Sequence, residues 1–142
     1  MKRAAISGNL RVLVVPLRPT RKADFPTISM KKYLSWSDPQ GRGAFDPWLR
    51  KHIQLGAQIV KIAPASMTAT GTVVEWRKWT GLDVQSLVRN AVAQHVRVER
   101  DGNRLYVEIP FKGGLVPLKY YVLAGVCVYT EPNVWLFHKL EF

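Results

Sequence analysis

Three basic side chains follow the first apolar segment of the chain and could bind an anion. Arg18, Arg21 and Lys22 lie in the stretch RPTRKADFP, directly after the apolar run LRVLVVPL. In open α/β sheets, ligands bind beyond the carboxyl ends of the strands, which is where this stretch would lie. The three cations could therefore hold a phosphate or a carboxylate, with an ordinary basic loop as the alternative interpretation.

A second group of polar side chains lies near the end of the chain, in the segment EPNVW over residues 131–135. Pro132 predicts a turn. In that turn Glu131 and Asn133 could hold an amine, or they could cap the backbone of the turn itself. The residues alone do not separate these two interpretations.

The common catalytic and metal-binding motifs are absent from the sequence. It has no G-x-S-x-G, H-E-x-x-H or C-x-x-C motif and no Walker A loop. The three histidines, His52, His95 and His138, lie far apart and lack the spacing of metal ligands, so we expect no metal site. The ten acidic residues include no pair that stands out as an acid/base couple.

A capped helix followed directly by a strand is the central unit of the predicted fold. Asp46 can accept hydrogen bonds from the first turn, and Pro47 suits the first helical position. Gly56 can end the helix in a left-handed conformation. Alternating residues over 57–63 then predict a strand. A helix that turns straight into a strand is typical of a layered sheet protein.

The other expected elements lie before and after this unit. The run from Leu10 to Leu17 is nearly all apolar, which predicts a central strand buried on both faces. Thr72 and Glu75 form a capping box, and Asp83 caps a further helix. The remaining expectations are helices over 28–36, 73–80 and 84–94, a hairpin over 96–109, and strands over 115–123, 126–130 and 134–137 with a break at 131–133.

Length and composition indicate one basic domain. The chain has 142 residues, 21 Lys and Arg against 10 Asp and Glu, and a net charge of +11. Such a charge favours polyanionic partners, or it is only a solvated basic surface. The single cysteine, Cys127, excludes an internal disulfide and fits a cytoplasmic location. The apolar runs are too short for a membrane span, so we expect no membrane partner.

Several segments together resemble a known enzyme family. They are LRPTRKADFP, FDPWLRKHIQLGA, SMTATGTVVEWRKWTG, GGLVPL and YTEPNVWLFH, in this order from about Val12 to His138. They are similar to the C-terminal half of a bacterial branch of the GNAT N-acyltransferase superfamily. The resemblance implies an α/β (α+β) fold with a partial GNAT-like mixed sheet and short helices. The helix and hairpin over 84–109 have no counterpart in it and are expected as an insertion into a single domain, 1–142.

The resemblance implies acyl transfer from acetyl-CoA or another acyl-CoA to an amine. His52 occupies the position of a family tyrosine that protonates the departing thiolate, although a helix-face histidine with a satisfied hydrogen bond is the alternative interpretation. Arg18, Arg21 and Lys22 would contact the CoA phosphates. The expected substrate-binding residues are Tyr33, Trp36, Trp48, Glu131, Asn133 and Trp135.

One part of the family pattern is missing. The only near match to the family's pyrophosphate loop is the stretch QGRGAF over residues 40–45, where Phe45 replaces a small residue and the place in the fold is wrong. By the resemblance, the first four strands of the fold are also missing. An acyltransferase would therefore need a partner chain or a longer chain to be complete. We expect a homo-oligomer or a partner chain joined through an exposed sheet edge.

The alternative function is a non-catalytic basic binding module for nucleic acid or a protein partner. Residues 1–32 contain eight Lys or Arg residues against one acid, Asp24. With Tyr33 and Trp36 beside them, these cations could bind single-stranded nucleic acid by phosphate neutralisation and stacking. The basic residues of this segment are Lys2, Arg3, Arg11, Arg18, Arg21, Lys22, Lys31 and Lys32.

Overall fold

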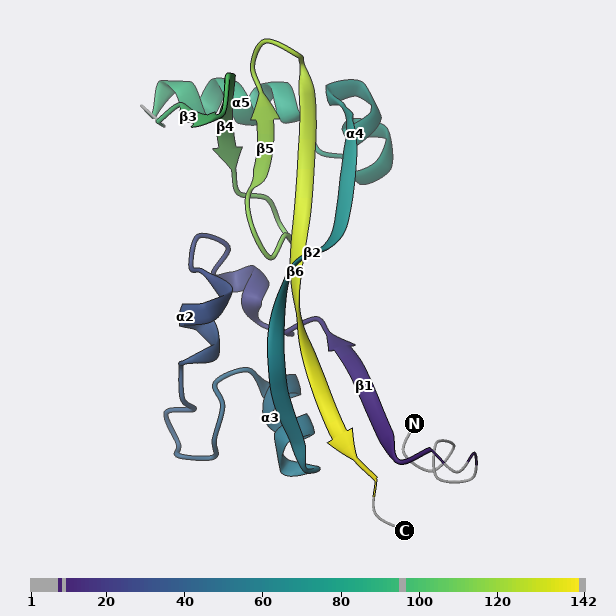
Figure 1. Cartoon of the computed structure of the whole chain (residues 1–142). Coiled ribbons are helices and arrows are strands. Elements are labelled where there is room, and N and C mark those ends of the chain that lie inside the picture. The colour runs from purple at the N-terminus through teal and green to yellow at the C-terminus, as the bar shows by residue number, and fades with distance from the viewer. Residues whose placement is uncertain (1–7, 9, 95–96, 141–142) are drawn as a thin grey trace.

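A computed structural model describes residue 8, residues 10–94 and residues 97–140. Expectations that rest on Lys2, Arg3 or His95 lie outside these residues. The elements in chain order are β1 (Val12–Leu17), η1 (Lys22–Asp24), α2 (Met30–Leu34), α3 (Pro47–Gln54), β2 (Ala57–Thr72), α4 (Val73–Thr80), α5 (Val84–Ala93), β3 (Glu99–Asp101), β4 (Arg104–Ile109), β5 (Leu118–Tyr121) and β6 (Val126–Lys139) (Figure 1). None of the helices in these ranges is long and apolar enough to cross a membrane.

The two long strands β2 and β6 form the spine of one sheet (Figure 1). On its other side, β6 pairs with β5 near its start and with β1 near its end, while β4 and β3 extend the sheet from β5. Every pairing between the named strands is antiparallel. The expected α+β class is confirmed, including the helix α5 and the β3–β4 hairpin of the 84–109 segment.

The predicted break at residues 131–133 is wrong, because β6 continues through Pro132. The register of β2 shifts at this point: Ala63 pairs with Asn133, and Met67 pairs with Glu131. Three residues of β2 therefore lie opposite the single residue Pro132. Proline lacks a backbone N–H, and a bulge in the partner strand removes the need for one.

This bulge divides the sheet into two halves with separate hydrophobic cores (Figure 1). The first half holds β1, η1, α2, α3 and the adjoining parts of β2 and β6. The second half holds the remaining elements. The buried residues of the first core are Leu17, Met30, Tyr33, Leu49, Ala57, Leu115, Val134 and Leu136. Those of the second core are Trp76, Val84, Val107, Ile109, Leu118, Cys127 and Tyr129.

The prediction of a central strand at Leu10–Leu17 is wrong in its position. Strand β1 lies at an edge of the sheet and pairs only with β6 among the described residues. Val12 and Val14 are exposed, whereas Leu13 and Val15 are half-buried beneath α3. The strand is apolar on both sides, yet the described residues cover only one of them.

The predicted helix caps are confirmed. Asp46 caps α3 with Pro47 in its first turn, and Thr72 and Glu75 form both bonds of the capping box of α4. Asp83 caps α5 by accepting from the backbone N–H of Ser86. These contacts depend only on residues close in sequence, which is why the pattern predicted them.

Candidate functional site

Two buried histidines form a pair between α3 and β6. His52 Nδ1 and His138 Nε2 lie 2.9 Å apart, although 86 positions separate the residues in sequence. The side chains are 7% and 2% exposed. At this distance one ring nitrogen donates a proton to the other, so at least one imidazole is neutral.

The pair lies at an apolar cavity of about 350 Å³ between α3 and β1. Trp48, Lys51, His52 and Leu55 contribute from one face of α3, with the i, i+3, i+4 and i+7 spacing of a helix stripe. The ring of Trp48 stands edge-on to that of His52, with 4.8 Å between the centroids. Leu13 and Val15 of β1 and His138 of β6 complete the lining. The cavity is thus an apolar space with two imidazoles and one ammonium beside it.

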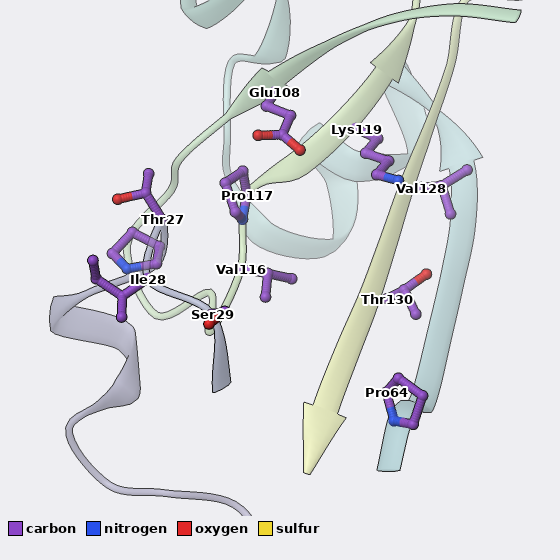
Figure 2. A pocket seen from close by; sticks show the side chains of 11 residues that line it. Thr27, Ile28, Ser29, Pro64, Glu108, Val116, Pro117, Lys119, Val128 and Thr130 are labelled. Carbon is purple, nitrogen blue, oxygen red and sulfur yellow. The ribbon is translucent and has the colours of Figure 1, made fainter. Parts of the chain in front are cut away.

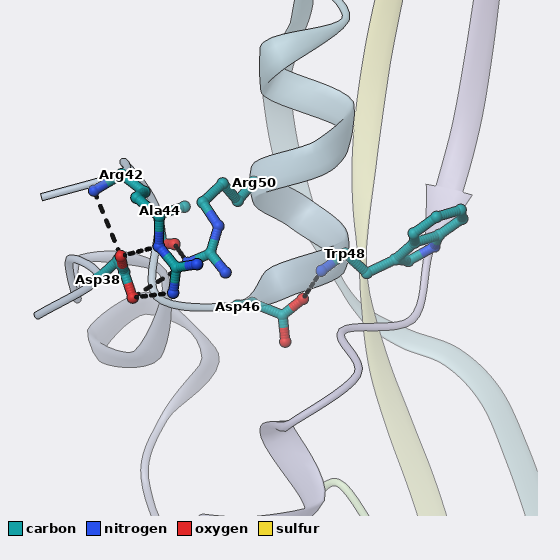
Figure 3. Close-up of polar contacts among 6 residues, drawn as sticks. All are labelled: Asp38, Arg42, Ala44, Asp46, Trp48 and Arg50. Atoms are coloured by element: carbon teal, nitrogen blue, oxygen red, sulfur yellow. Dashed lines mark hydrogen bonds and ion pairs between the residues drawn. The ribbon is translucent and has the colours of Figure 1, made fainter. Parts of the chain in front are cut away.

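The carboxylate of Asp46 fixes the position of α3. Its Oδ1 atom accepts from the backbone N–H groups of Trp48 (3.1 Å) and Leu49 (3.0 Å) at the start of the helix, and Figure 3 shows the first of these bonds. Its Oδ2 atom accepts from the Arg21 backbone N–H (3.0 Å) and the Tyr33 hydroxyl (2.5 Å). Burial acts to raise the pKa of Asp46, but these hydrogen bonds outweigh it and hold the pKa below its usual value.

Two of the expected substrate-binding aromatics belong to the first core. Tyr33 is buried, and burial together with its bond to Asp46 raises the pKa of its hydroxyl. Trp36 packs edge-on against Phe25 and Phe45, with ring centroids 4.9 and 5.3 Å away. These contacts give both side chains structural roles, and neither lines the cavity at His52.

The three cations expected to bind phosphates do not converge on one site. Lys22 is fully buried, and its ammonium donates to the carbonyl oxygens of Phe25 and Leu115, both at 2.7 Å. The Arg21 guanidinium pairs with Asp24 at 3.2 Å and lies over the ring of Phe45. Lys22 therefore has a structural role and is not part of the proposed phosphate-binding site.

Arg18 and Glu131 belong to a network where the two halves of the sheet meet. Arg18 donates to Glu131 Oε1 at 3.0 Å and to the carbonyl oxygen of Gly113 at 2.7 Å. The Tyr129 hydroxyl donates to Glu131 Oε2 at 2.7 Å, and it accepts from the backbone N–H of Leu115. Burial and the bond to Glu131 raise the pKa of Tyr129 to about 12. The network ties the 113–115 turn to β6.

The residues of the EPNVW segment are not brought to His52. Glu131 and His138 are seven positions apart on β6, which corresponds to about 23 Å in an extended strand. Asn133 donates to the Ser66 hydroxyl at 2.9 Å. Trp135 alternates with Leu136 and His138 along β6 and so lies on the opposite face of the sheet. Among the expected substrate-binding residues, only Trp48 adjoins His52.

In the glycine loop over residues 40–45, two backbone N–H groups donate to the neighbouring residue Asp38. The Gly41 N–H donates to the carbonyl oxygen of Asp38, and the Arg42 N–H donates to the Asp38 carboxylate. Arg42 and Arg50 both pair with that carboxylate, at 2.7 and 3.3 Å (Figure 3). The described residues therefore offer no ready cradle for a pyrophosphate at this loop.

A second cavity, of about 410 Å³, lies at the junction of the two halves (Figure 2). Glu108 of β4 and Lys119 of β5 are cross-strand neighbours in its lining, opposite residues 27–29. Thr130, also in this lining, is eight positions from His138 on β6, or about 26 Å along an extended strand. This cavity is therefore separate from the histidine pair.

Sequence reasoning identified His52 and Trp48 but missed the role of His138 as the partner of His52. The alternation of β6 predicts that residues 134, 136 and 138 share one face of the strand, which places His138 on the same side as apolar residues. It could not show that this face meets α3. No group of three or more His, Cys, Asp or Glu side chains suited to a metal ion occurs in the part of the chain that the structure describes.

Comparison with known proteins gives one similarity that bears on function. The chain is 35% identical over 146 residues to an arginine N-acetyltransferase of Aspergillus versicolor, an alignment that covers 99% of this chain. The chain spans about half the length of that curated relative, 48% of it. No family model matches the sequence, and no solved structure matches it. The name of that relative describes an acetyltransferase, and the similarity does not test the expected bacterial branch.

Proposed function

We propose that the chain is part of a GNAT-type N-acyltransferase that moves an acyl group from acyl-CoA to an amine. The observation that carries this proposal is the His52–His138 pair beside an apolar cavity. The cavity suits the acyl-thioester end of the donor, and the pair supplies a titratable group there. The similarity to an arginine N-acetyltransferase supports the same reaction class.

In this mechanism the acceptor amine attacks the thioester carbonyl carbon. A carbon–nitrogen bond forms, the carbon–sulfur bond breaks, and the departing thiolate takes a proton from His52. The acylated nitrogen releases one proton to solvent, and His52 takes up a proton from solvent before the next turnover. The oxyanion would be stabilised by backbone N–H groups of a strand, as the family resemblance implies. Trp48 and Leu55 line the cavity beside His52, and the ring of Trp48 packs edge-on against the imidazole.

The donor's pyrophosphate needs a binding site beyond the described residues. The ammonium of Lys22 is buried and donates to the carbonyl oxygen of Leu115. In the 40–45 loop, the Gly41 N–H donates to the carbonyl oxygen of Asp38. We propose that a further segment or a second chain supplies this site and docks at the edge of β1. The length of the relative supports that view, since this chain spans about half of it.

The test is an acyl-transfer assay with acetyl-CoA and arginine, the acceptor named for the relative. Release of free CoA is followed with a thiol reagent. Cys127 interferes little because burial raises the pKa of its thiol to about 11. The matched variants are His52→Phe, which removes the proposed acid, and Trp79→Phe, a change on α4 away from the cavity.

We expect acetylated arginine from the wild type and from Trp79→Phe, and none from a folded His52→Phe protein. Assays are made with the chain alone and with the chain joined to the remaining half of the relative. Full activity of His52→Phe would remove His52 from the mechanism. No turnover in either form, with arginine or with other amines, would reject the proposal.

A further inference from the structure

We propose that His138 is a positioning residue that fixes the tautomer and the orientation of His52. This inference rests on the proposed function, in which His52 is the acid. The two rings are 2.9 Å apart through His52 Nδ1 and His138 Nε2, so His138 occupies one of the two ring nitrogens of His52. In the proposed mechanism the proton leaves from the other ring nitrogen, Nε2.

The geometry limits the pair to one positive charge. If both imidazoles were protonated, two N–H groups would point at each other across 2.9 Å. When His52 is the imidazolium, its Nδ1–H donates to a neutral His138. When His52 Nε2 gives its proton to the thiolate, the Nδ1–H bond to His138 is unchanged. His138 therefore stabilises the charged acid and keeps it in one tautomer through the reaction.

The described lining of the cavity places one charged side chain beside the pair. Lys51 on α3 is the one other titratable side chain there, while β1 contributes Leu13 and Val15. A nearby ammonium disfavours a second positive charge, which again favours a single proton in the pair. The ring of Trp48 holds the other side of His52. Lys51 and Trp48 are thus the described side chains that act on the charge and the orientation of His52.

The test compares His138→Gln with His138→Leu in the active form of the enzyme. The glutamine amide oxygen can still accept from His52 Nδ1–H, whereas leucine cannot. We expect His138→Leu to lower kcat by about tenfold or more. This loss is smaller than the roughly 100-fold or larger contribution of general acid catalysis, because His52 itself remains in place. We expect KM for the acyl donor to change little, and His138→Gln to recover most of the loss. Equal kcat and equal pH profiles for the two folded variants would overturn the inference.

A second measurement does not depend on activity. The imidazole nitrogens of a ¹⁵N-histidine-labelled protein are followed by NMR from pH 5 to 9, in a His95→Gln background that leaves only the pair. We expect linked titration of the two rings and one His52 tautomer, which His138→Leu converts to a mixture. Independent titration of the rings would overturn the inference. Linked titration in a protein without turnover would support the pairing while rejecting the proposed function.

Discussion

At the scale of single residues, Asp46 is the side chain on which the site most depends. Its four hydrogen bonds join the start of α3 to η1 and to Tyr33 of α2. Among the described residues, no other side chain accepts hydrogen bonds from the N–H groups at the start of α3. The position of His52, two turns along α3, follows from where Asp46 holds the first turn.

Replacing Asp46 by Ala should lower the free energy of unfolding by about 2 to 4 kcal/mol, because it removes a cap and leaves the buried Tyr33 hydroxyl without its acceptor. Urea unfolding at pH 7 measures this loss. The matched control is Asp83→Ala, which removes the cap of α5 at an exposed position and should cost clearly less. Equal losses in the two variants would contradict the role given to Asp46.

The stabilising effect of Asp46 should also depend on pH. Because its pKa is lower in the folded protein, its contribution is fully present above the unfolded value of about 3.9. It is lost as the pH falls through the folded pKa. The stability gap between wild type and Asp46→Asn should therefore narrow as the pH is lowered from 5 toward 2. Unfolding curves at several pH values measure the gap, and a constant gap would contradict this prediction.

At the scale of elements, two buried glycines, Gly71 near the end of β2 and Gly114 in the turn before β5, test how tightly their surroundings pack. A Cβ atom at Gly114 would lie 2.9 Å from the Val116 carbonyl oxygen and 2.7 Å from the Phe111 ring. A Cβ atom at Gly71 would lie 2.7 Å from the ring of Trp79, which is 54% exposed and can move outward.

Gly114→Ala should therefore destabilise the protein by about 1 to 3 kcal/mol, as overpacking does in a core. Gly71→Ala should cost less, because an exposed ring yields more easily than backbone, and it should alter the fluorescence of Trp79. Thermal unfolding and tryptophan emission measure the two effects. A larger loss from Gly71→Ala than from Gly114→Ala would show that Trp79 is more firmly held than its exposure indicates.

What the sequence could predict follows from the range of the interactions involved. The caps at Asp46, Thr72 and Asp83 use atoms a few residues apart, and all three were predictable. The edge position of β1 and the passage of β6 through Pro132 depend on pairings with distant segments. Those pairings leave little trace in a local pattern. The same holds for the histidine pair, because the helix that carries His52 was predictable from local residues and its contact with His138 was not.

At the scale of the whole molecule, the edge strands β1 and β2 differ in how they resist association. Strand β2 is an edge along its full length, but two register shifts interrupt it. Lys61 lies between the two shifts, and Pro64 lies within the second. Bulges, charges and prolines are features that protect an edge from pairing. Strand β1 has six residues, of which only Pro16 is of this kind. Val14 of β1 is 51% exposed. The edge of β1 is thus the more open of the two.

We therefore expect the 142-residue chain to associate with a second copy through β1, and Val14→Lys to shift it toward the monomer. A lysine at an edge opposes strand pairing by its charge and its hydration. Sedimentation velocity over a range of protein concentrations measures the shift. The matched control is Leu123→Lys, in the turn between β5 and β6, where the side chain is 86% exposed and adjoins no open edge. Equal effects of the two substitutions would indicate general hydrophobic adhesion, and a monomeric wild type would contradict pairing through β1.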